Sequence, residues 1–281
     1  MGLRINTNVP SLVAQRNLRT TRGSLDKSLE RLSSGSRINH AGDDAAGLAI
    51  SESIRAQVRG LAQAERNAQD GVSMVQVAEG ALGEVSNILI RMRELGVQAA
   101  SDTVGSTERR FLDVEFQQLM EELDRIAQST EYNRVPLLNG MASTFEIQIG
   151  TRNNPIIDRV KLFDSSGADV NPVAIGINLT SVADKASAQN SLSSLDGALN
   201  SVTAIRAEFG AIQNRLQSVI NNIMISKENL SAANSRIRDT DIAEEMSELT
   251  KNQILMQSGV SVLAQANQTA KTALGLLGNQ G

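Results

Sequence analysis

The 281-residue chain has no cysteine, no tryptophan, one histidine, one tyrosine and five phenylalanines. The absence of cysteine excludes disulfides, thiolate nucleophiles and cysteine-based zinc or iron–sulfur sites. A single histidine excludes multi-histidine metal sites and leaves little support for histidine acid–base chemistry. Six aromatic side chains are too few for base-stacking platforms or a large ligand pocket. The composition therefore disfavours most enzymes and nucleic-acid-binding proteins.

Charge and hydropathy exclude further classes. The formal net charge is −4, which argues against nucleic acid as the main partner. No apolar run approaches 18 residues, so we expect no membrane insertion. The first residues lack the apolar region of a secretory signal peptide, and taken alone this predicts a cytoplasmic protein. The apolar content is almost entirely aliphatic, which favours helices packed along their length.

Long apolar repeats dominate the pattern. Between residues 195 and 237, apolar side chains recur at alternating spacings of three and four, which indicates one long helix. A second repeat, over 50–99, is rich in alanine and glycine and predicts close helix–helix packing. A third and shorter repeat follows it. We expect helices over about 45–103, 106–130 and 187–237, arranged as an antiparallel bundle or coiled coil.

The periodicity changes between about 133 and 185. Apolar residues alternate with polar ones at 145–149 and 160–162, and glycine, asparagine and proline supply turns between them. The stretch 173–179 completes this pattern. These features predict a small module of β-hairpins, so the expected fold class is mainly α with a small β-hairpin module in the middle.

Both chain ends predict amphipathic helices whose apolar seams are too weak to fold alone. Residues 9–35 have leucines at seven-residue spacing, and Asp239-Thr240-Asp241 resembles an N-cap that starts a new helix. Such helices need each other or other copies of the chain. The residues that we expect to form this assembly seam are Leu18, Leu25, Leu32, Leu249, Met256, Val260, Leu263, Leu274 and Leu277.

No residue set suggests catalysis, so we expect a protein that is not an enzyme and has no cofactor or metal. His40 with Asp43 and Asp44 could suggest a metal site, but a capping or hydrogen-bonding role fits better because no second histidine exists. Ser33-Ser34-Gly35-Ser36 lacks the lysine and spacing of a phosphate loop. A rod with seams at both ends is a candidate assembly subunit.

Two long motifs carry a family resemblance. The stretch 32–50, LSSGSRINHAGDDAAGLAI, resembles the N-terminal signature of bacterial flagellins, as does Ile5-Asn6-Thr7-Asn8. The segment 239–245, DTDIAEE, and the segment 263–268, LAQANQ, resemble the family's C-terminal signature. The resemblance implies a subunit that self-assembles into the extracellular flagellar filament, in a minimal form without variable outer domains. A hook–filament junction protein with flagellin-like ends is the alternative.

The resemblance also implies domains and partners. Residues 1–44 and 238–281 would form the inner core, and 45–237 the outer tube domain. The chain would be exported unfolded by the flagellar type III apparatus, which needs no cleaved signal. Its partners would be other flagellin subunits, hook-associated and cap proteins, an export chaperone on the C-terminal helix, and the flagellin-sensing Toll-like receptor. The positions that match the receptor or subunit contacts of the family are Arg91, Leu95 and Glu115.

Overall fold

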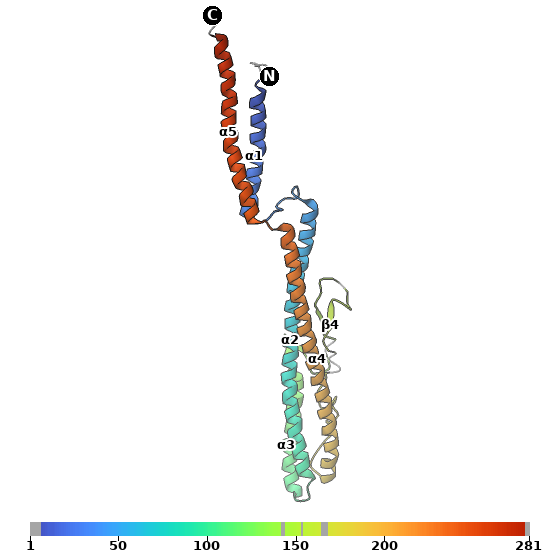
Figure 1. The fold of residues 1–281 in the computed structure, drawn as a ribbon. Coiled ribbons are helices and arrows are strands. Elements are labelled where there is room, and N and C mark those ends of the chain that lie inside the picture. The colour runs from blue at the N-terminus through green and yellow to red at the C-terminus, as the bar shows by residue number, and fades with distance from the viewer. Residues whose placement is uncertain (1–6, 142–143, 153, 164–167, 279–281) are drawn as a thin grey trace. The chain divides into compact units, whose positions relative to one another are not determined.

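The computed structural model describes residues 7–141, 144–152, 154–163 and 168–278 and is mainly α-helical (Figure 1). In this part of the chain the elements are α1 (Val9–Ser34), α2 (Ala45–Ala100), α3 (Ser106–Ser129), β1 (Glu131–Tyr132), β2 (Val135–Pro136), β3 (Glu146–Gln148), β4 (Arg159–Lys161), α4 (Lys185–Arg238) and α5 (Ile242–Gly278). Among the described residues, no helix has both the length and the hydropathy needed to cross a bilayer.

The chain forms two compact units. Unit 1 comprises Met1–Ala56 with Leu230–Gly281, and unit 2 comprises Gln57–Asn229. In unit 1, α1 and α5 lie side by side and antiparallel (Figure 1). Asn8 at the start of α1 donates to the Ala266 carbonyl at 2.9 Å, and Arg31 near its end pairs with Glu245. Unit 1 is therefore built from both chain ends.

Unit 2 is a helical bundle with a continuous apolar core. The described parts of α2 and α4 run antiparallel, because Glu65 pairs with Lys227 while Arg93 pairs with Asp196. From Leu195 to Leu216 the core residues of α4 follow the expected alternating spacing of three and four. The next position in that spacing is Val219, but the buried residue is Ile220. The fully buried aromatic side chains are Phe116 and Phe209, and Phe209 packs on Phe163 with ring centroids 4.8 Å apart.

The β-module is smaller than the sequence pattern suggested. β1 pairs with β2 and β3 with β4, both antiparallel, with Ile147 opposite Val160. The expected strand over 173–179 is wrong, because this stretch forms turns. The Pro172 carbonyl accepts from the backbone N–H groups of Ile177 and Asn178, at 2.9 and 3.1 Å, and this turn buries Ile177.

Candidate assembly interface

The two chain ends are joined where α1 finishes and α5 begins. Gly35, with φ +67°, ends α1 in the left-handed conformation that glycine adopts readily. Its carbonyl accepts from the Thr240 N–H at 3.0 Å, and the Arg37 N–H donates to the Arg238 carbonyl at 2.6 Å. Ser36 and Asp239 form an antiparallel bridge. These backbone bonds fix the start of α5 beside the end of α1.

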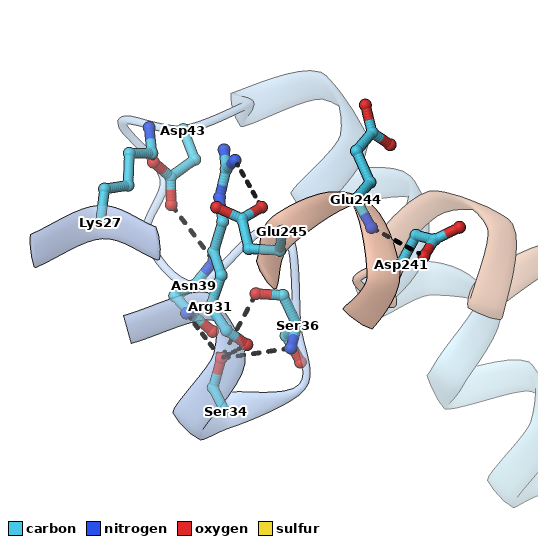
Figure 2. A network of polar contacts seen from close by, with 9 residues as sticks. All are labelled: Lys27, Arg31, Ser34, Ser36, Asn39, Asp43, Asp241, Glu244 and Glu245. Carbon is cyan, nitrogen blue, oxygen red and sulfur yellow. Dashed lines mark hydrogen bonds and ion pairs between the residues drawn. The ribbon is translucent and has the colours of Figure 1, made fainter. Parts of the chain in front are cut away.

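Side chains extend this junction into a polar network (Figure 2). Lys27 on α1 reaches Asp43 at 2.6 Å, and Arg31 reaches Glu245 on α5 at 3.4 Å. The Asp43 carboxylate also accepts from the backbone N–H groups of Asn39 and His40. One carboxylate therefore holds the loop after α1 and ties that loop to the helix.

The aspartates of the two motifs act as sequence analysis predicted, through hydrogen bonds. Asp44 accepts from the Gly47 N–H at 2.8 Å, which caps the start of α2. Asp241 accepts from the N–H groups of Ala243 and Glu244, at 2.9 and 3.2 Å, and so caps α5. His40 makes an exposed contact with Glu30. Among the described residues, no group of acidic and histidine side chains has the arrangement of a metal site.

The network lowers the pKa values of two carboxyl groups. The hydrogen bond from Lys27, followed by those from the His40 and Asn39 N–H groups, holds the pKa of Asp43 far below its ordinary value. The hydrogen bond from Arg238 likewise lowers the pKa of Glu52 on α2. Because both groups are more acidic in the fold, their charged forms stabilise unit 1.

Acid is expected to loosen the loop after α1. A depressed pKa stabilises the fold at every pH above the ordinary carboxyl value of 3.8, and this contribution is lost progressively below it. We expect amide hydrogen exchange at Asn39 and His40 to accelerate, after correction for intrinsic rates, as the pH falls below about 4.

The matched control is Asp43→Asn, which keeps an oxygen acceptor but removes the titrating charge. Its Asn39 and His40 amides should be less protected at neutral pH and should lack this acid-dependent component. The same pH dependence in both proteins would contradict the role of Asp43.

The α1–α5 pair buries few side chains. The buried residues of α1 are Ser11, Ala14 and Ser28, and in the described part of α5 they are Leu249 and Asn252. The helices approach closely where Leu18 meets Gly259, because a Cβ at Gly259 would lie 2.7 Å from the Leu18 side chain. Isolated helix pairs with so little buried apolar surface are only marginally stable.

The predicted seam residues differ in burial. Leu249 is buried, Val260 is exposed, and those that are half-buried are Leu18, Leu25, Leu32, Met256 and Leu263. The side chains of Leu274 and Leu277 lie outside the described residues. Many further apolar side chains of the pair face solvent: Val9, Leu12, Val13, Leu29, Ile242, Met246, Ile254, Leu255 and Val262. Exposed apolar surface of this extent is typical of a protein–protein interface.

The second predicted site lies in unit 2, where α2 and α3 are joined by an ion pair. Arg91 donates to Glu115 through two nitrogens, at 3.0 and 2.7 Å, and also pairs with Glu94. These hydrogen bonds, of which the one to Glu115 has the largest effect, raise the pKa of Arg91. Leu95 is only 1% exposed and belongs to the core. The structure therefore brings Arg91 and Glu115 together on the surface and places Leu95 beneath it.

Sequence reasoning missed the ion pairs of the junction. Arg31 and Glu245 are 214 residues apart, so no local pattern relates them. The only available signal was the predicted pairing of the terminal helices, which would bring the end of one beside the start of the other. That reasoning gives the neighbourhood of Arg31 but not the identity of its partner.

Comparisons with known proteins cover nearly the whole chain. Residues 5–143 match the family model of the bacterial flagellin N-terminal helical region, and residues 192–277 match that of the C-terminal helical region. The chain is 45% identical to a flagellin of Halalkalibacterium halodurans over 97% of its own length and 99% of that relative. It is 42% identical to a flagellin of Bacillus subtilis, with 98% and 100% covered.

A solved structure gives the same indication. The crystal structure of Bacillus cereus flagellin matches with a TM-score of 0.50 and 35% sequence identity, covering 60% of this chain and 94% of that one. The match combines a common fold with sequence identity.

Proposed function

The chain belongs to the bacterial flagellin family, and from this premise we propose that its two ends form the inner core of a filament. In this proposal residues 1–44 and 238–281 are the inner core, and 45–237 the outer tube domain. The observation that carries the assignment is the exposed apolar surface of α1 and α5. This surface leaves the helix pair incomplete until other copies cover it.

The protein is a structural subunit of the flagellar filament, and its family is structural rather than enzymatic. The seam residues are proposed to contribute more to the polymer than to the monomer. Leu249 already packs within unit 1, whereas Val260 is exposed and would be buried only by a neighbouring subunit. Burying such a valine or leucine contributes about 1.5–3 kcal/mol.

Assembly of purified protein tests this proposal. Seeded or salted-out monomer is expected to form filaments of micrometre length in electron micrographs, because each copy offers the same incomplete face to the next. A hook–filament junction protein would instead remain short and would occur in few copies in isolated flagella. Failure to elongate, together with a low copy number, would favour that alternative.

We propose that the chain is exported unfolded through the flagellar type III apparatus. A chaperone would bind its C-terminal helix, and cap and hook-associated proteins would contact it at the filament. The exposed apolar residues of α5, such as Ile254 and Leu255, support a chaperone contact because they need cover before assembly. A strain without the apparatus should retain the protein inside the cell. Normal secretion by that strain would refute this route.

We also propose that Arg91 and Glu115 form part of a surface for the flagellin-sensing Toll-like receptor, with Leu95 supporting it from below. Arg91→Ala removes a guanidinium that the receptor would contact, and we expect receptor signalling by monomer to fall by about tenfold or more. Arg93→Ala is the matched control, since Arg93 also pairs across helices, with Asp196. Equal effects of the two substitutions would count against a specific contact.

A further inference from the structure

A polar cavity of about 400 Å³ lies within unit 1, between the end of α1 and the start of α5. This volume falls in the lower part of the range for ligand sites, about 300–1,000 Å³, and suits a short polar segment. Two of the side chains that line it are more than nine-tenths buried, Ser28 at 4% exposed and Asn252 at 8%. Neither side chain forms a hydrogen bond within the described residues, and their polar atoms stay open to solvent in the cavity.

Two other residues of the cavity lining each have one buried polar atom without a partner. The Arg31 Nε and the Thr240 hydroxyl are both buried and without a partner in the described part of the chain. A buried donor or acceptor that is left unpaired destabilises a fold, because its hydration is lost without a replacement. Two buried unpaired atoms beside the polar side chains of Ser28 and Asn252 indicate that the cavity can receive hydrogen-bonding groups from outside unit 1.

The charge that remains at the cavity is negative. Lys27 is paired with Asp43, Arg31 with Glu245, and Glu248 with Lys251. Arg37 donates to the uncharged Ile237 carbonyl, and its positive charge is offset by Asp241 in the same lining. In contrast, the Glu244 carboxylate has no partner in the described residues, and Figure 2 shows it directed away from Asp241. An occupant should therefore carry one positive charge together with donors and acceptors.

The first eight residues have this chemistry. Their sequence, MGLRINTN, contains one basic residue, no acidic residue, and the amides and hydroxyl of Asn6, Thr7 and Asn8. The same copy cannot supply it to its own cavity. Asn8 caps the far end of α1, and the 23 residues to Arg31 span about 35 Å of helix. The four residues from Asn8 back to Arg4 reach at most about 14 Å.

We propose that this cavity receives the N-terminal segment of the next copy in the filament, with Arg4 of that copy paired to Glu244. The inference rests on the proposed assembly through unit 1. Asn8, where the donor segment joins α1, lies at the opposite end of the helix pair from the cavity, so the contact is head-to-tail. Repetition of such a contact adds copies along one direction and produces an open polymer.

Chemical cross-linking in filaments tests the contact, and the cysteine-free chain gives a clean background. The variant carries Arg4→Cys with Glu244→Cys and is treated with a short bismaleimide, which joins two sulfurs. Assembled protein should give a ladder of covalent multimers, while monomer and each single-cysteine variant should not. Filaments of normal length without a ladder would overturn this contact, while the proposed function as a filament subunit would stand. A ladder from Lys271→Cys with Glu244→Cys instead would identify the C-terminal end as the occupant and would also overturn it.

Charge exchange gives a second and independent measurement. Arg4→Glu and Glu244→Arg, each alone, place like charges together and should raise the protein concentration needed for elongation by about 30-fold. The double exchange should return it close to that of the unaltered chain. If the double variant assembles no better than the singles, the two residues do not meet.

Discussion

A chain that ends at residue 239 is expected to form no filaments and to keep unit 2 folded. The truncation removes α5, which is the partner of α1 and carries six of the eleven exposed large apolar side chains in the described part of unit 1. Unit 2, Gln57–Asn229, keeps every residue of its own core. Electron microscopy and sedimentation measure assembly, and circular dichroism measures the remaining helices. Filaments formed by the truncated chain would refute the assignment of the assembly face.

A single substitution should reproduce this loss. Leu263→Asp places a carboxylate on the half-buried seam of α5, where assembly would strip it of water without providing a partner. The matched control is Ser261→Asp, which adds the same charge at an exposed position two residues away. We expect the first variant to stay monomeric and the second to elongate. Equal impairment would mean that charge on α5, rather than the seam, governs assembly.

The second large effect concerns stability. Phe209→Ala should lower the free energy of unfolding of unit 2 by about 3–5 kcal/mol, because it leaves a cavity where a fully buried ring packs on Phe163. Urea unfolding of the monomer, followed by circular dichroism, measures the change.

Phe111→Ala on α3 is the control for this experiment. Phe111 is 71% exposed, so the same chemical change should alter stability by no more than about 0.5 kcal/mol. A similar loss from both variants would show that the core does not depend on the packing at Phe209.

The helices could be predicted because their apolar spacing is a local property. On α4 the period-3.6 pattern identifies the buried side from Leu195 to Leu216, and every core residue there is an expected one. After Ile223 the same pattern continues, yet the side chains at 226, 230 and 233 are only half-buried. Periodicity reports which side of a helix is apolar, whereas burial also depends on whether another element covers that side.

Two features could not be predicted, for different physical reasons. The cavity between α1 and α5 depends on how side chains distant in sequence, such as Ser28 and Asn252, meet in space. The turn at 173–179 imitates a strand because its apolar residues alternate. There the deciding factor is Pro172, which has no N–H to donate to a ladder and whose carbonyl closes the turn instead.

The pairing of α1 with α5 also sets an order of events in folding. Asn8 and the Ala266 carbonyl are 258 residues apart, whereas unit 2 is complete at residue 229. Contacts of such high sequence separation carry a large loop-closure entropy and form slowly. Whenever the chain is delivered with its N-terminus first, unit 2 can fold before α5 is available to pair with α1. The face that joins subunits is therefore completed last. Because of this delay, unit 2 of each molecule folds before the molecule can polymerise.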